Sequence, residues 1–398
     1  MKSSRNDMTN AQAKERSSPR NYSEWIDILR GFAALSVILY HSRVQLWVGY
    51  HEIRTSPQTY SSLDRMLAFL SFPAACGGSA VILFFLISGV CVHLPYAGDK
   101  RRFDLREYAL RRSFRILPPY WFAVVLTCLL EWLVYSLGGS TPTGWLVIGR
   151  VASLTQNYGQ HAGQLFTNGS LWSLPVEMEL YVAYLLFYFL LKTAGKWTCA
   201  TMVAITSLVV AIAYYHGLGD LGQNFAFFWA IWCAGAFLAE GFGRGNLPKF
   251  KLWNGILLLT LAAISVWGES RQWHLAILTY LWGATYFHII WLALRNPGVL
   301  RRFPRRAVGL LVWSGKISYS AYLIHGPLFA LCGFLWIHAF GDKPASFLVP
   351  LAFSAGVWPI AWLFWRFCEM PFHQIAQRIS KRRPVAVIVP EPLRKFSG

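Results

Sequence analysis

An arginine and a histidine share one face of the first apolar segment of the chain. Arg30 and His41 lie 11 positions apart, which in an α-helix is about three turns and about 16 Å along the axis. Ionisable side chains are costly inside a membrane, so each is a candidate for function. A neutral imidazole can take a proton from a hydroxyl near neutral pH. We therefore predict that His41 is a general base, the alternative being an interfacial arginine and a histidine that only packs.

A pair of arginines follows the second apolar segment. Arg112 and Arg115 stand at i and i+3, so they share a helix face on which two guanidinium groups can hold a phosphate or a carboxylate. An apolar stripe that runs from Phe103 to Leu117 predicts that this part of the chain is a helix lying on the cytoplasmic surface. The alternative is that these charges only set the topology and bind acidic lipid.

Two carboxylates enter the fourth apolar segment. Glu177 and Glu179 are two positions apart, and side chains at this spacing diverge on a helix. We expect one of them to face the interior of the bundle, where Glu177 would orient His41 or neutralise an arginine. The alternative for Glu177 is an acid stabilised by the dipole at the helix N-terminus.

A polar face is also expected on the ninth apolar segment. Ser318, Tyr322 and His325 recur at helical spacing, so they lie on one side of the helix. Such a face serves either as a polar seam between helices or as part of a ligand site.

Ten apolar segments can position these residues. Apolar stretches of about 20 residues are read as membrane-spanning helices, because lipid offers no hydrogen-bond partners to the backbone. The segments are 31–50, 76–94, 119–137, 171–191, 197–215, 223–239, 252–268, 274–294, 317–340 and 346–367. The sequence thus predicts an all-α polytopic membrane protein with about ten transmembrane helices.

The distribution of basic residues predicts the topology. Thirty of the 37 lysines and arginines fall on alternate connections, including both ends of the chain. Cytoplasmic connections carry the positive charge, so we expect both termini to be cytoplasmic. We predict a disordered cytoplasmic tail at 1–23, a transmembrane domain at 24–375 and a basic cytoplasmic tail at 376–398.

The composition excludes several classes of function. The chain has a net charge of +19. Its basic residues flank the apolar segments and form no continuous tract, so binding of lipid headgroups explains the charge better than binding of nucleic acid. The chain has no P-loop, dinucleotide-binding or HExxH motif. Its seven cysteines include no CxxC pair, so we expect neither a metal site nor a disulfide framework.

Taken together, these motifs resemble the acyltransferase-3 family of integral-membrane acyltransferases. The resemblance covers about residues 22–375 and rests on several stretches in a fixed order. They are Leu29-Arg30-Gly31 with His41, Phe84-Phe85-Leu86-Ile87-Ser88-Gly89, Arg112-x-x-Arg115 before Pro118 and Tyr120-Trp121, Trp172-Ser173-Leu174 with Glu177 and Tyr181, Ser318-Tyr319 with Tyr322-Leu323 and His325, and Glu369-x-Pro371-Phe372. The family commonly has two adjacent acids where Met178 here separates Glu177 from Glu179.

The resemblance implies a mechanism. The histidine matching His41 acts as the base on an acceptor hydroxyl, Arg30 belongs with it, and Arg112 and Arg115 lie near a coenzyme A donor. Acyl-coenzyme A is polyanionic and cytoplasmic, so Arg305 and Arg306 on the same predicted side are further candidates for the donor site.

We therefore expect an O-acyltransferase of a bacterial plasma (inner) membrane. It would move an acyl group, most simply acetyl from acetyl-CoA, to a hydroxyl of a carbohydrate or lipid-linked glycan. The donor is a substrate, and no permanently bound cofactor is expected. The competing hypothesis is a proton-coupled transporter or flippase that uses the same polar residues as a relay. A scaffolding protein would not need four polar intramembrane clusters.

Overall fold

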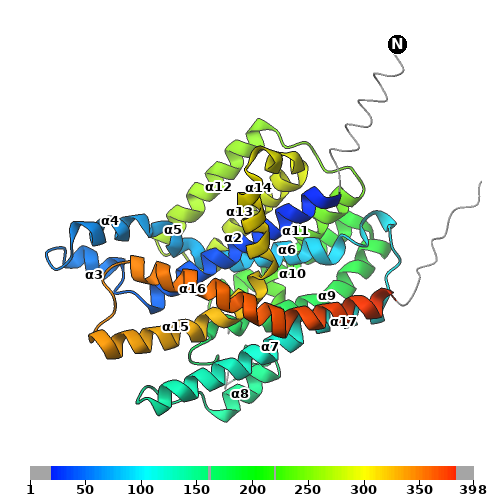
Figure 1. The fold of residues 1–398 in the computed structure, drawn as a ribbon. Coiled ribbons are helices and arrows are strands. Elements are labelled where there is room, and N and C mark those ends of the chain that lie inside the picture. Colours follow the sequence, from blue (N-terminus) through cyan, green and yellow to red (C-terminus); the bar gives the residue numbers. More distant parts are fainter. Residues whose placement is uncertain (1–18, 160–162, 219–220, 382–398) are drawn as a thin grey trace, which may run out of the picture.

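The computed structural model describes residues 19–159, 163–218 and 221–381. Within these ranges the chain forms helices and no strand beyond one isolated bridge between Leu165 and Asn168. The long helices run roughly side by side as a bundle (Figure 1). The all-α, multi-pass architecture predicted from the sequence is therefore confirmed.

The long helices match the ten apolar segments in order. They are α2 (Pro19–Gln45), α6 (Ala80–His93), α7 (Leu105–Ser136), α9 (Ser173–Thr193), α10 (Gly195–Tyr215), α11 (Phe225–Gly243), α12 (Leu252–Ser270), α13 (Leu275–Arg295), α15 (Ser318–Phe340) and α16 (Leu348–Phe364). In the described part of the chain, nine helical stretches are long and apolar enough to cross a membrane, and α2 is the long helix outside that set. Its polar residues, among them Arg30, His41 and Arg43, lower its hydropathy.

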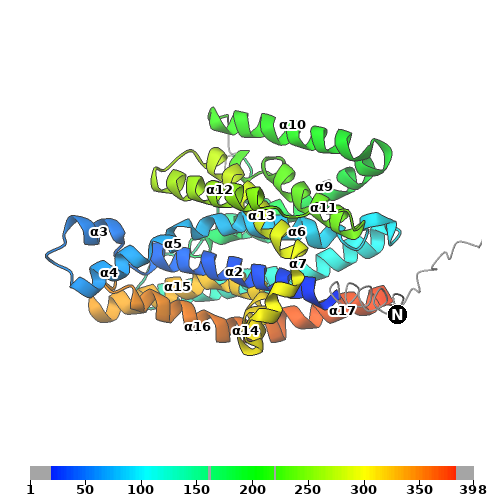
Figure 2. The same cartoon turned by 90° about the horizontal axis from the view of Figure 1, so that it is seen from above.

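Shorter helices lie between the long ones. They are α3 (Tyr50–Thr55), α4 (Ser62–Leu70), α5 (Phe72–Ala75), α8 (Trp145–Ala152), α14 (Arg305–Lys316) and α17 (Met370–Lys381), which follows a π-helical turn at Trp365–Glu369. In Figure 2, α14 crosses the direction of the long helices. Its residue Gly315 packs against the backbone of Asp27 so closely that a Cβ atom would overlap with it.

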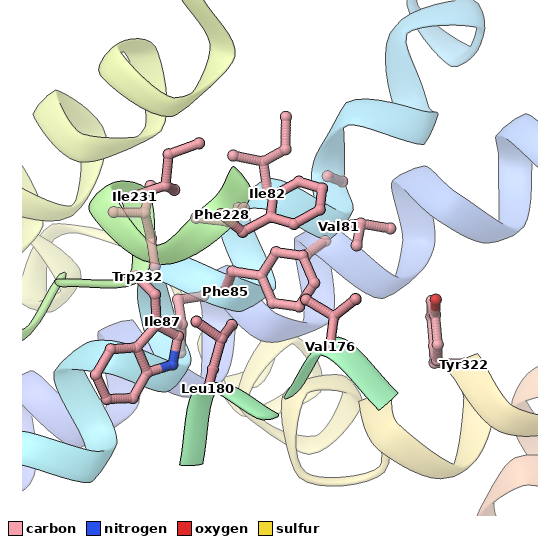
Figure 3. Close-up of a cluster of buried hydrophobic side chains, with 14 of the residues drawn as sticks. Val81, Ile82, Phe85, Ile87, Val176, Leu180, Phe228, Ile231, Trp232 and Tyr322 are labelled. Carbon is pink, nitrogen blue, oxygen red and sulfur yellow. The ribbon is translucent and has the colours of Figure 1, made fainter. Parts of the chain in front are cut away.

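A close contact between α6 and α11 holds the centre of the bundle. A Cβ atom at Gly89 would collide with the carbonyl oxygen of Trp232, and one at Gly235 would collide with that of Leu86. Small residues allow two membrane helices to approach in this way. Figure 3 shows the apolar cluster beside this contact, with the hydroxyl of Tyr322 at its edge. This apolar cluster packs beside the site that is described below.

The structure corrects three boundaries. The predicted surface helix is not a separate element, because α7 runs without a break through Pro118 and Pro119 into the membrane span; prolines are tolerated in spanning helices where neighbours satisfy the freed backbone groups. The first segment ends at Gln45 and not at residue 50. The predicted tails, 1–23 and 376–398, mostly lie outside the described residues, but α2 already begins at Pro19 and α17 extends to Lys381.

The start of α2 and the end of α17 lie at the same end of the bundle in both views (Figures 1 and 2). The connection that begins at η2 (Ala97–Asp99) and η5 (Pro297–Arg302) belong to this end as well, because α6 and α13 lead into them. We call it the inner end, and the opposite end, which carries α3 and α4, the outer end. That the inner end is cytoplasmic remains a prediction from the charge distribution.

Candidate active site

Arginines from two helices meet in one cavity toward the inner end. Arg30 of α2 and Arg112 and Arg115 of α7 line a cavity of about 70 Å³, which we call the inner cavity. The other lining residues with polar groups are Ser88, Cys91, Ser173, Glu177, Tyr181, Ser318, Tyr319 and Tyr322. The structure thus brings together residues that the sequence places on five different helices.

Two of these guanidinium groups are held by specific contacts. Arg30 forms an ion pair with Asp27 at 3.6 Å and donates to the sulfur of Cys91 at 3.2 Å. Arg112 lies over the rings of Tyr108 and Tyr181, at 6.0 and 5.5 Å from their centroids. Its Nη2 donates weakly to the Cys91 carbonyl at 3.4 Å, whereas its buried Nε has no partner among the described residues. Three guanidinium groups that line one cavity favour the binding of an anion there.

Glu177 belongs to the inner cavity and forms no hydrogen bond with His41. Its Oε1 accepts from Tyr181 at 2.5 Å and from Ser88 at 3.2 Å. Of the two roles predicted for this acid, its position among three arginines fits neutralisation of charge and not orientation of the histidine.

Glu179 points away from this cavity, as its spacing from Glu177 predicts. Both of its carboxylate oxygens accept from the Tyr158 hydroxyl at 2.7 Å, and Oε2 also accepts from the backbone of Phe225. Burial and the adjacent carboxylate raise the pKa of the Tyr158 hydroxyl, which lies outside the membrane spans. Through these hydrogen bonds, Glu179 links Tyr158, in the connection before α9, to Phe225 at the start of α11.

His41 lines a second cavity, toward the outer end. This outer cavity has a volume of about 330 Å³ and includes Tyr40, Trp172, Gln223, Glu269 and Trp282 among its lining residues. Val81 and Tyr322 line both cavities, so they form a shared wall. The predicted base and the predicted anion-binding arginines thus lie in adjoining chambers.

The hydrogen bonds of His41 indicate which ring nitrogen can accept a proton. Its Nδ1 lies 2.9 Å from the carbonyl oxygen of Val37 and 3.2 Å from Nε2 of His325. In turn, Nδ1 of His325 lies 2.6 Å from the carbonyl oxygen of Tyr322. A carbonyl oxygen only accepts, so we assign a hydrogen to Nδ1 of both rings. His325 Nε2 then accepts from His41, and His41 Nε2 keeps a free lone pair.

Tyr322 fixes the shared wall to the start of α9. Its hydroxyl donates to the carbonyl oxygen of Ser170 at 2.6 Å, and Ser173 donates to that hydroxyl at 2.7 Å. The predicted polar face of α15 is present, because Ser318 lines the inner cavity, Tyr322 the wall, and His325 contacts His41.

Arg305 and Arg306 lie apart from both cavities. Both are exposed at the start of α14, and Arg305 lines a different surface pocket with Glu24 and Val308. The structure does not bring them to Arg112 and Arg115.

Sequence reasoning assigned no role to three buried acids, Glu131, Glu240 and Glu369. Glu131 of α7 accepts from the backbone of Thr143 and from Thr167. Glu369, in the π-helical turn, accepts from Ser320 at 2.6 Å; its motif was part of the family resemblance. Glu240 of α11 accepts from His93 at 2.9 Å and from Arg244 at 2.5 Å, and this bond raises the pKa of Arg244 at the end of the span. The sequence signal for Glu240 is an acid inside an apolar segment.

Within the multi-pass bundle, a chamber that contains a histidine therefore adjoins a chamber lined by three arginines. A family model described as an acyltransferase domain matches residues 23–366. The chain belongs to this acyltransferase family.

Curated relatives match at low identity. The chain is 24% identical over 389 residues to the O-acetyltransferase OatA of Staphylococcus aureus (strain NCTC 8325 / PS 47), which covers 90% of this chain and 58% of that protein. It is 24% identical over 221 residues to the putative peptidoglycan O-acetyltransferase YrhL of Bacillus subtilis (strain 168), covering 50% of this chain and 30% of that protein. No solved structure matches the chain.

Proposed function

We propose that the protein is a membrane O-acetyltransferase that moves an acetyl group from acetyl-CoA to a hydroxyl of a carbohydrate or glycolipid. The observation that carries this proposal is the pair of adjoining cavities, one cationic and one containing His41, with Val81 and Tyr322 between them. The names of the relatives from S. aureus and B. subtilis support acetyl as the group. A bacterial plasma membrane is the proposed location.

The donor enters the inner cavity. Its phosphates are anionic, and Arg30, Arg112 and Arg115 supply the complementary charge. We place the diphosphate of the donor against these arginines and its slender pantetheine arm deeper in the cavity. The thioester at the tip of that arm would then reach the wall shared with the outer cavity, while the nucleotide stays at the inner end.

The acceptor hydroxyl enters the outer cavity. Nε2 of His41 takes its proton as the oxygen attacks the thioester carbonyl carbon, and His325 Nε2 accepts from Nδ1 of His41 and holds the ring in the reactive tautomer. The carbon–sulfur bond breaks, the coenzyme A sulfur receives a proton, and the new ester remains on the acceptor. A direct transfer of this kind needs no acyl-enzyme.

The experiment uses purified protein in detergent or nanodiscs with radiolabelled acetyl-CoA and membrane extract as the acceptor source. We expect release of coenzyme A and label in a glycan or glycolipid. Absence of both would refute the proposal and would favour the transporter hypothesis, for which the His41–His325 pair would be a proton relay.

A further inference from the structure

The outer cavity carries the opposite charge to the inner one. Among its described lining residues there is one carboxylate, Glu269, and neither lysine nor arginine. The remaining groups are His41, hydroxyls, the Gln223 amide and apolar or aromatic side chains, including Trp172 and Trp282. An aromatic surface with a few polar groups suits a polyol. A single carboxylate in the same cavity also distinguishes between ligands by their charge.

Only one oxygen of the Glu269 carboxylate has a hydrogen-bond partner among the described residues. Its Oε1 accepts from Nε1 of Trp282 at 3.1 Å, and both residues line the cavity. Trp282 stacks on Tyr286, with ring centroids 5.3 Å apart, and the Tyr286 hydroxyl lies 2.8 Å from that of Ser79. Oε2 of Glu269 has no hydrogen-bond partner in the described protein, so this oxygen is available to a ligand.

We propose that Glu269, oriented by Trp282, is the acceptor-recognition group, and that it restricts the enzyme to acceptors that are uncharged or carry an amine at the acylated sugar. This inference rests on the proposed function. A hydroxyl or an ammonium group donates to Oε2, whereas a carboxylate or phosphate in the same chamber meets a like charge and finds no cation. Glu269 acts as a specificity residue, and the proton transfer remains with His41.

The test uses membranes of the source organism in which the native copy is replaced by the parental chain, Glu269→Gln or Trp282→Phe. Membranes receive radiolabelled acetyl-CoA, and the acylated sugar is identified by mass spectrometry. Purified variants are assayed in parallel for coenzyme A binding and for hydrolysis of acetyl-CoA by water. Glutamine keeps an oxygen for the Trp282 N–H, so this change tests charge and not folding. Glu52→Gln, an exposed acid on α3 at the same end, is the matched control.

We expect the acylated sugar to be neutral or amino-substituted. Glu269→Gln should lower transfer to the acceptor about tenfold, the loss expected for one charge-assisted hydrogen bond. Trp282→Phe should cause a smaller loss in the same direction. Coenzyme A binding and hydrolysis by water should stay within about twofold of the parental values, because no donor contact changes.

Two results would overturn the inference. One is an acylated sugar that bears a carboxylate or phosphate; the other is normal transfer by Glu269→Gln. If the parental membranes incorporate no acetyl group at all, it is the proposed function that fails, and this outcome is distinct from either of the two.

Discussion

The two cavities on either side of Tyr322 differ in charge as well as in size. The inner cavity has three arginines against one glutamate, and the outer cavity has one glutamate and no lysine or arginine among its described lining. Charged side chains are costly inside a membrane, so those that occur there are candidates for a functional role. The difference in charge favours an anion in the inner cavity and a neutral or cationic molecule in the outer cavity. In the proposed reaction, the two reactants meet at the wall between them.

The largest expected effect comes from removing the base of the outer cavity. His41→Ala should lower acyl transfer by about 10²–10⁴, the usual contribution of a positioned base, while donor binding in the inner cavity remains. Coenzyme A release by purified protein and calorimetry with coenzyme A measure the two quantities.

His288→Ala is the matched control for His41→Ala. His288 also donates from Nδ1 to the carbonyl of the residue four positions earlier, but it lines neither cavity. A His41→Ala protein that kept more than about a tenth of parental turnover, well above what loss of a base allows, would show that His41 is not the base.

Removing a cation from the inner cavity should have the next largest effect. Arg112→Ala or Arg115→Ala should weaken coenzyme A binding by about 1.5–3 kcal/mol, or about 10- to 150-fold, because each deletes a charge-assisted contact. Arg112→Lys should also weaken binding, since it loses the planar group that lies over Tyr181. Unchanged donor affinity, measured by calorimetry, would reassign these arginines to lipid binding.

Removing the hydrogen bonds that hold Tyr322 in the shared wall should make the separation of the two cavities less complete. Tyr322→Phe removes the hydrogen bonds to Ser170 and Ser173, which contribute about 0.5–1.5 kcal/mol each. Hydrolysis of acetyl-CoA without acceptor should rise by about two- to tenfold relative to transfer. Tyr280→Phe, which deletes a hydroxyl bonded to Phe227 away from both cavities, should leave the ratio unchanged. Equal ratios in both variants would mean that Tyr322 does not separate the reactants.

The smallest effect is expected at the start of α14. Arg305 and Arg306 are exposed and line neither cavity, so they can act on the donor only through long-range attraction, which salt screens over about 8–10 Å. Arg305→Ala and Arg306→Ala should change donor affinity by about twofold or less, and less still at high salt. A tenfold loss in calorimetry would place the nucleotide against α14.

Much of the inner cavity could be predicted from the sequence, because an ionisable residue in an apolar segment is conspicuous. Arg30 and Glu177 were found in this way, and Arg112 by its spacing from Arg115; all three line the cavity. The orientation of His41 could not be predicted, since its partner His325 is 284 positions away. Nor could the continuity of α7, because two prolines ordinarily suggest a break.

The outer cavity was less predictable for a related reason. Glu269 follows directly after the predicted segment 252–268, where an acid looks like an ordinary residue of a connection. In the structure α12 continues to Ser270, and this extra length places Glu269 in the chamber. The environment of a residue is therefore hardest to predict from the sequence when the residue lies within one turn of a predicted helix end.

The polarity of α2 has a consequence for how the protein is made. This helix precedes the nine spanning stretches along the described chain, yet it is not apolar enough to be counted among them. Arg30, His41 and Arg43 each reduce the free energy that α2 gains on entering lipid, so α2 alone is a weaker spanning helix than the nine stretches. Beyond α2 itself, Arg30 contacts Cys91 of α6 and His41 contacts His325 of α15, and both of these helices are synthesised later. Stable integration of α2 therefore depends on later helices, and the helix that carries His41 gains its contact with α15 only when most of the described chain has been synthesised.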